Sequence, residues 1–503
     1  MNKILKAMFC VTFFSVCTRA LGFLLKIYLS RELGSVLLGS YQVAMSIFAV
    51  LMTLVSSGIP VVLSRNVSFY AGKNNKKAIG SITSSGLILT FAICAVIFMI
   101  MLICPNVLNL IFTSNASTEM LLILLPALIS SAVYEVLRGT LWGEKQFFAI
   151  SFTEFLEQVI RIIILIILFE TTFLNMSPTN KTALSLSLAC IISSIIVIII
   201  YFKKGGKLYN PKPEFAKLFK TSTPITAVRT ISSMVSSIIA ILIPLRLMTY
   251  GFSKTEALAE FGIIMGMTFP LVMIPSTLIS SLAVTIIPSI SEQSNNIDSG
   301  ELKNKTVLKN KISFALKATI IFASILVSTF IALGIPICNL LYNNSKAGKY
   351  LCYSALLMIP MGISQITSSI LNAIGLEMKS LKNYAISSSM LIVCIYFLPK
   401  YIGTFALLIG YFLMSVSASV LNLKMLSSRK LLNYEFVKTL LTMLAIVGLS
   451  SLLGIFVYNL VSFNLWLSLI VGGCSTFGST ILLLFAFNLA DFKIIAFRRS
   501  KSV

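Results

Sequence analysis

KAMFCVTFFSVCTRALGFLLKIYLS, residues 6–30, is an apolar run long enough to cross a lipid bilayer as a helix. Similar runs recur along the 503-residue chain, which is 57% hydrophobic and only 11% charged. A soluble domain carries about a quarter charged residues. The alternating ~10-residue segments of a membrane β-barrel are absent. The sequence therefore predicts an all-α polytopic membrane protein.

The breaks between the apolar runs predict about fourteen transmembrane helices. The predicted spans are 6–30, 38–64, 80–104, 118–140, 151–173, 182–202, 218–248, 257–288, 310–335, 348–371, 382–398, 403–427, 437–460 and 465–488.

The basic residues predict the orientation of these spans. With a cytoplasmic N-terminus, the cytoplasmic loops and tails hold 29 lysines and arginines, the opposite loops hold 7, and 4 lie inside spans. Such an asymmetry follows the positive-inside rule. Both termini are therefore predicted to be cytoplasmic, and most of the net charge of +24 reflects topology rather than nucleic-acid binding.

A long basic connection suggests two lobes with an appended helix pair, because transporters are often built from internal repeats. We predict an N-lobe over 1–203, a cytoplasmic linker over 204–216, a C-lobe over 217–430, and a last helix pair with a basic tail over 431–503.

Soluble catalysis has no support in the sequence. Histidine is absent, which excludes Ser-His triads and imidazole metal ligands. The nine cysteines are scattered and form no CxxC pair, and no P-loop is present. We expect no enzyme activity, no cofactor and no metal site.

Three of the four cations inside the spans lie in the first and seventh: Arg19 and Lys26 in the first, and Arg229 in the seventh. A charge at mid-bilayer costs roughly 2.5–3.5 kcal/mol on insertion scales, so each needs a reason. Lys26 either snorkels to the interface or faces a polar cavity. Arg19 and Arg229 lie about 15 Å from the nearest interface at 1.5 Å per residue, which favours a cavity.

The fourth and fifth spans carry a second group of charges: Glu135, Arg138, Glu154, Glu157 and Arg161. The spacing allows Glu135 to pair with Arg138, and Glu157 with Arg161. Such pairs either neutralise each other structurally or take part in substrate binding or ion coupling. We predict that Arg161 binds substrate with Arg19, Lys26 and Arg229, and that the other four serve charge balance or ion coupling. A cationic interior favours an anionic substrate, and guanidinium suits phosphate.

Prolines mark where helices can bend. Pro60 follows a glycine in the second span, and Pro270 and Pro275 share the eighth span with two glycines. A proline removes a backbone hydrogen bond and kinks a helix. These positions are either packing kinks or gating bends, with Pro60, Pro270 and Pro275 as the gating candidates.

Several segments resemble the stage V sporulation protein B group of the polysaccharide-transporter branch, within the MOP flippase superfamily. They are TRALGF (18–23), SRELG (30–34), SGIPVVLSR (57–65), EQVIR (157–161), PLV (270–272), SSLA (280–283) and PSISE (288–292). Their order and spacing across residues 1–300 carry the resemblance. The segment FFAI (147–150) departs from the proline and small residues usual there.

The resemblance implies two six-helix lobes in a V shape, a final pair that cradles a lipid tail, and export of undecaprenyl-pyrophosphate-linked sugars. It implies spore cortex peptidoglycan as the destination and a pyrophosphate-binding role for Arg19. We therefore expect a monomeric flippase of the cytoplasmic membrane that works by alternating access on lipid II or a similar precursor. Its expected partners are membrane lipids and cell-wall synthesis or sporulation enzymes, not nucleic acid. The alternatives are a multidrug/cation antiporter of the same superfamily and a non-transporting sporulation assembly factor.

Overall fold

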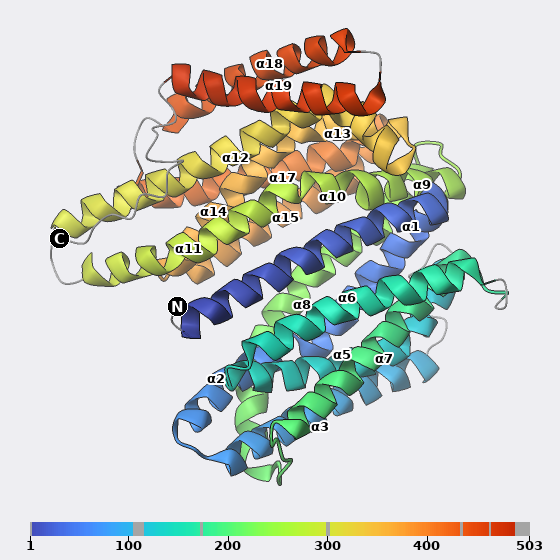
Figure 1. Cartoon of the computed structure of the whole chain (residues 1–503), viewed down its shortest axis with the longest axis vertical. Helices are drawn as coiled ribbons and strands as arrows, with labels where there is room; N and C mark the ends of the chain where they lie inside the picture. The colour runs from blue at the N-terminus through green and yellow to red at the C-terminus, as the bar shows by residue number, and fades with distance from the viewer. Residues whose placement is uncertain are drawn as a thin grey trace. The chain divides into compact units, whose positions relative to one another are not determined.

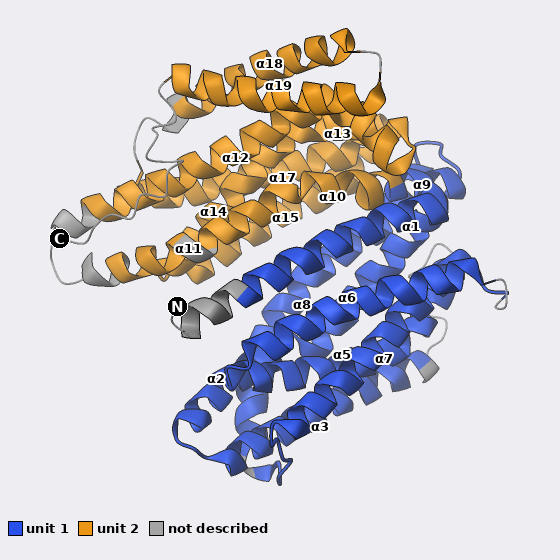
Figure 2. Ribbon diagram, in the orientation of Figure 1, with its two compact units in different colours: residues 1–262 blue, residues 263–503 orange. Residues whose placement is uncertain are grey.

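The computed structural model describes residues 3–103, 115–171, 175–297, 302–432, 436–461 and 464–487, and within these ranges every regular element is a helix (Figure 1). A helix satisfies all its backbone hydrogen bonds internally, as a lipid environment requires. The all-α prediction is confirmed. The helices form two compact units, Met1–Gly262 and Ile263–Val503 (Figure 2).

The first unit contains eight helices among the described residues. They are α1 (Lys3–Ser56), α2 (Ile59–Gly72), α3 (Lys76–Ile103), α5 (Asn115–Gly143), α6 (Phe147–Glu170), α7 (Pro178–Lys203), α8 (Lys212–Met248) and α9 (Lys254–Phe261).

The second unit begins inside a π-helical segment, η1. Its elements are η1 (Gly262–Thr268), α10 (Phe269–Val272), α11 (Ile274–Ile297), α12 (Leu302–Tyr342), α13 (Ser345–Ser354), η2 (Ala355–Leu357), α14 (Met358–Ala373), α15 (Glu377–Phe397), α16 (Pro399–Ile402), α17 (Phe405–Ser428), α18 (Phe436–Leu460) and α19 (Leu465–Ala486).

Helix α1 covers the first predicted span and most of the second. Its kink is at Gly34, where φ is 66° and ψ is 177°. A positive φ strains residues that carry a Cβ, so glycine is the natural residue for this break. Helix α1 ends at Ser56. After Ser57 and Gly58, α2 starts at Ile59 with Pro60 in its first turn.

The core of the first unit is apolar and joins α2, α3, α5 and α8. Ile59 and Leu63 of α2 pack with Ile82 of α3, Val136 of α5 and Leu218 of α8. Helix α8, which follows the predicted linker 204–216, therefore packs within the first unit.

The connection between α7 and α8 is bonded to its surroundings. The Tyr201 hydroxyl donates to the Lys207 carbonyl at 3.1 Å, and the hydroxyls of Ser81 and Ser85 on α3 donate to the carbonyls of Asn210 and Pro211 at 2.6 and 2.9 Å. These contacts anchor the segment to α3 and α7. The assignment of 204–216 as a linker between two functional lobes stays a prediction.

Helix α12 organises the second unit. It packs against α11, α13, α14, α18 and α19. The last two helices also pack against each other, and a hydroxyl contact of 3.2 Å joins Thr329 of α12 to Thr476 of α19. The predicted C-terminal helix pair is thus attached to the second unit through α12.

Eleven helical stretches of the described residues are long and apolar enough to cross a membrane. The first, Cys10–Gly72, includes the second predicted span and most of the first. The predicted spans 151–173 and 382–398 fall largely on α6 and α15, which are not among the eleven. The chain is a multi-pass membrane protein, and the count of fourteen stays a prediction.

Candidate functional site

The four predicted substrate-binding cations all belong to the first unit. Arg19 and Lys26 lie on α1, Arg161 on α6 and Arg229 on α8. The side chains of Arg19, Lys26 and Arg229 are exposed, and Arg161 is half-buried. Within the described part of the chain, no ion pair joins any of the four to a carboxylate. None of these cations is therefore neutralised by a direct acidic partner.

Lys26 and Arg161 are brought near each other where α1 packs against α6. The charge of Arg161 acts electrostatically on Lys26. Arg161 Nη2 donates to the Tyr41 hydroxyl of α1 at 3.2 Å, while its Nε is buried without a hydrogen-bond partner. We call Lys26, Tyr41 and Arg161 the cationic cluster. Two like charges repel more strongly in a low-dielectric setting, so an anion placed near both would stabilise this arrangement.

Close helix packing positions this cluster. A Cβ added to Gly22 of α1 would lie 3.8 Å from the Gln158 amide nitrogen of α6, an ordinary van der Waals contact. Gly22 lies one turn before Lys26, and Gln158 lies about one turn before Arg161. The two helices are therefore in contact beside the two cations.

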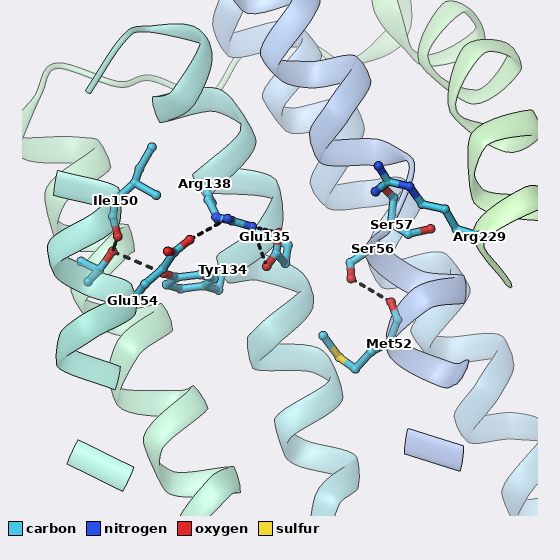
Figure 3. A network of polar contacts seen from close by, with 10 residues as sticks. Met52, Ser56, Ser57, Tyr134, Glu135, Arg138, Ile150, Glu154 and Arg229 are labelled. Carbon is cyan, nitrogen blue, oxygen red and sulfur yellow. Dashed lines mark hydrogen bonds and ion pairs between the residues drawn. The ribbon is translucent and has the colours of Figure 1, made fainter. Parts of the chain in front are cut away.

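Glu135, Arg138 and Glu154 form a closed ion-pair network (Figure 3). Arg138 Nη1 lies 3.0 Å from Glu135 Oε2, and Arg138 Nη2 lies 2.6 Å from Glu154 Oε1. The side chains of the two glutamates are 26% and 32% exposed, so all three groups are largely withdrawn from solvent. The spacing predicted the contact within α5, and the structure adds Glu154 from α6.

Glu157 lies outside that network. The Cys190 thiol of α7 donates to Glu157 Oε1 at 3.9 Å, and the Ser193 hydroxyl, about one turn further along α7, donates to the Cys190 carbonyl at 3.1 Å. Glu157 and Arg161 both belong to the part of the chain that the structure describes, and their spacing of four residues favours an ion pair. No ion pair joins them. The reason is that Arg161 bonds to Tyr41 while Glu157 is held by α7.

Arg229 interacts with the break between α1 and α2. Its Nη1 donates to the Ser57 carbonyl at 2.8 Å (Figure 3). A Cβ on Gly58 would come within 2.3 Å of Thr226 Oγ1, so α8 is packed tightly against this break. The last carbonyls of a helix lack intrahelical partners and attract cations. Arg229 thus has a structural partner here, and its role in substrate binding stays a prediction.

A cavity of about 380 Å³ lies beside the same break, among α1, α2, α3 and α8. Apolar side chains such as Leu54, Leu89 and Phe219 line it, together with the hydroxyl residues Thr226 and Thr230. Its lining contains no charged residue, so its chemistry suits hydrocarbon rather than phosphate. Arg229 is not among the lining residues.

The candidate gating prolines stand in first helical turns. Pro60 is the second residue of α2, Pro270 of α10 and Pro275 of α11. At the start of a helix the missing N–H costs no intrahelical bond, which applies to Pro60. Pro270, in contrast, directly follows a helical segment, since Thr268 has φ −76° and ψ −52°. Immediately before Pro270, the backbone is π-helical over Gly262–Thr268, and π-helical turns often occur at functional sites. The structure places interruptions where the prolines predicted them, and gating by these residues stays a prediction.

Tyr41, Cys190 and the Ser57 carbonyl were not predicted as site residues. Tyr41 belongs to the segment GSY (39–41), which also resembles the stage V sporulation protein B group, but the resemblance gives it no role, and nothing in the sequence separates Cys190 from the other scattered cysteines. Their contacts depend on which faces of α1, α6 and α7 meet. In the described residues, no group of three His, Cys, Asp or Glu side chains could hold a metal ion.

Known proteins share this chain's sequence and fold. Its sequence is 24% identical over 378 residues to stage V sporulation protein B of Bacillus subtilis (strain 168), covering 72% of this chain and 71% of that protein. It is 22% identical over 305 residues to sporulation protein YkvU of the same organism, covering 58% of this chain and 66% of that protein.

Among solved structures, lipid II flippase MurJ in an inward closed conformation matches with a TM-score of 0.72 at 17% identity, covering 95% of this chain and all of that one. An inward-facing multidrug resistance MATE family transporter of the MOP superfamily matches with a TM-score of 0.67 at 16% identity, covering 82% and 94% of the two chains. At such identities these structures show the fold alone, which is that of the MOP superfamily.

The pattern of the family described as polysaccharide biosynthesis protein matches residues 4–294, more than half of the chain. The resemblance found in the sequence motifs of residues 18–292 is therefore confirmed. The chain belongs to the polysaccharide biosynthesis protein family, with the fold of the MOP superfamily flippases and transporters.

Proposed function

We propose that this protein is a flippase that moves an undecaprenyl-pyrophosphate-linked saccharide, lipid II or a similar cell-wall precursor, across the cytoplasmic membrane. It works by alternating access, with both termini in the cytoplasm, and performs no chemistry on its substrate. The saccharide serves the spore cortex, a destination supported by the similarity to stage V sporulation protein B.

The observation that supports this proposal most strongly is the cationic cluster. Lys26 and Arg161 come together from two helices without an ion pair to a carboxylate. A pyrophosphate carries the charge that would compensate both, and guanidinium forms paired hydrogen bonds to phosphate oxygens. In the proposal, Arg19 binds the pyrophosphate from the same helix as Lys26. Arg229 binds it with the N–H groups that its hydrogen bond to the Ser57 carbonyl leaves unused.

The acidic residues suit this proposal better than export of organic cations. An exporter of cations needs carboxylates that are free to bind substrate, whereas Glu135 and Glu154 are both bonded to Arg138. Glu157 has no ion pair among the described residues, but it lies one turn from the cation Arg161 on the same helix. The network Glu135–Arg138–Glu154 then serves charge balance. Pro60, Pro270 and Pro275 would permit the bending that alternating access requires.

The test is translocation of a fluorescent lipid-linked saccharide by purified protein in vesicles. Arg161→Gln and Lys26→Gln should each lower the rate about 10- to 100-fold, since a hydrogen bond to a charged group contributes about 1.5–3 kcal/mol. Arg19→Ala should also abolish most translocation. Lys349→Gln, which removes an exposed cation from α13, is the matched control and should retain the wild-type rate.

Undiminished translocation by both the Lys26 and Arg161 variants would refute the role of the cationic cluster. A wild-type protein that moves organic cations but no lipid-linked saccharide would favour the antiporter. Movement of neither substrate would favour an assembly factor.

A further inference from the structure

Helix α6 carries two glutamates one turn apart that have opposite surroundings. Glu154 is held by Arg138 at 2.6 Å. Glu157 has no ion pair among the described residues and contacts the neutral thiol of Cys190. A charged carboxylate without a cation is costly inside a membrane unless it gains a proton.

The neutral partner of Glu157 suits both of its protonation states. The Cys190 thiol can donate weakly to a carboxylate, and its sulfur can accept weakly from a carboxylic acid. Glu157 can therefore change charge and keep its contacts. Glu154 cannot, because its protonation would weaken the bond to Arg138.

The charged groups around Glu157 link it to the cationic cluster. Arg161 follows Glu157 by about one turn of α6, Glu154 precedes it by about one turn, and Glu135 lies on the neighbouring helix α5. On the other side, Arg161 acts on Lys26 of α1. Helix α7 presents the Cys190 thiol to the carboxyl group. A charged Glu157 offsets part of the positive charge of Arg161, and a protonated Glu157 leaves that charge for an anion.

We infer that Glu157 is a proton-binding site coupled to anion binding at Lys26 and Arg161, so that the proton and the anion bind together. The proton comes from water, adds to a carboxylate oxygen of Glu157 and returns to water when the anion leaves; no covalent bond of the anion is broken. This inference rests on the proposed function, since it names what accompanies the anionic head group. One proton cancels one of the charges carried through the membrane, and each charge is worth about 2.3 kcal/mol per 100 mV.

The test measures binding of farnesyl pyrophosphate, a short-chain lipid pyrophosphate, to full-length protein in nanodiscs between pH 6 and pH 8. Because the probe itself titrates, wild type is compared with Glu157→Gln at each pH. The glutamine is permanently neutral, so no loss of a proton at this position can weaken the affinity of the variant for the probe. The affinity of wild type should therefore fall relative to that of the variant as pH rises, by up to about tenfold per pH unit. Calorimetry in buffers of different ionisation enthalpy should show that wild type takes up about one more proton per bound probe than the variant.

Glu144→Gln is the matched control. Glu144 lies just beyond the end of α5, and burial raises the pKa of its carboxyl group against the opposing charge of Lys76. It is thus another partly buried carboxyl group of the same unit that lies outside the cluster, and its variant should keep the wild-type pH dependence.

Equal pH dependence of wild type and Glu157→Gln would overturn the inference and leave the proposed anion site standing. Absence of probe binding to wild type at every pH would overturn the anion site and the inference with it. If Glu157→Gln does not fold, the number of protons that wild type takes up on binding the probe is the deciding measurement. A number that the titration of the probe alone explains would contradict the coupling.

Discussion

The ion-pair network and the cationic cluster share helix α6 but differ in whether their charges have partners of opposite charge. In the network, Arg138 bonds to Glu135 and Glu154, so each charge has a direct partner. In the cluster, Arg161 lies about two turns further along α6 than Glu154, beside Lys26 and the neutral Tyr41. Every charge of the first group has a direct partner of opposite charge, and neither cation of the second group has one.

This difference distinguishes charges that stabilise the fold from charges that are available to bind an anionic ligand. Removing one member of a buried ion pair leaves an uncompensated charge, whereas removing one of two like charges relieves repulsion. Stability and ligand binding should therefore respond in opposite ways to substitutions in the two groups.

The largest effect is expected from Arg138→Met. It leaves two carboxylates without their cation, and we expect a loss of about 3 kcal/mol in the free energy of unfolding. Arg161→Met removes one hydrogen bond to Tyr41 and one repulsive charge, and should lower stability by no more than about 1 kcal/mol. Thermal unfolding of both variants in one detergent measures the difference. Equal destabilisation by the two substitutions would contradict the distinction between network and cluster.

Local spacing allowed part of this contrast to be predicted. The contact of Glu135 with Arg138 follows from residues three apart on one helix. The expected partnership of Glu157 and Arg161 is not formed, because Tyr41 of α1 and the Cys190 thiol of α7 compete for the two side chains. Sequence spacing gives the available pairs, and helix packing decides among them.

The fold was more predictable than the site. Apolar runs identify helices because lipid leaves the backbone few other structures. The packing of α8 was not predicted: Leu218 of α8 lies in the same core as Ile59 and Ile82. The lobe boundary at the long basic connection before α8 stays a prediction. Loop length and charge carry no information on which apolar faces meet.

A smaller effect should appear as an energetic coupling within α5 and α6. A double-mutant cycle of Arg138→Met with Glu154→Gln should give a coupling of about 2 kcal/mol, since the two side chains are in contact. The matched cycle of Arg161→Met with Glu157→Gln should give a smaller coupling of about 1 kcal/mol, because that pair interacts through its charges but is not bonded. Unfolding of the single and double variants provides both values. A coupling of Glu157 with Arg161 as large as that of Arg138 with Glu154 would show that the second pair is also a structural ion pair.

The smallest effect should come from Tyr41→Phe. Its hydroxyl accepts one hydrogen bond from Arg161 and carries no charge. Without this bond Arg161 is held less firmly, and the binding free energy of farnesyl pyrophosphate should weaken by about 1 kcal/mol, which is about a fivefold lower affinity. Because Tyr41 acts through Arg161, Tyr41→Phe should have no effect on affinity when added to Arg161→Gln, whereas an independent structural role would lower affinity in both backgrounds. The pH dependence attributed to Glu157 should be unchanged in Tyr41→Phe, since the charges remain in place. A shift in that dependence would mean that the cluster and Glu157 are connected through Tyr41 rather than through the charge of Arg161.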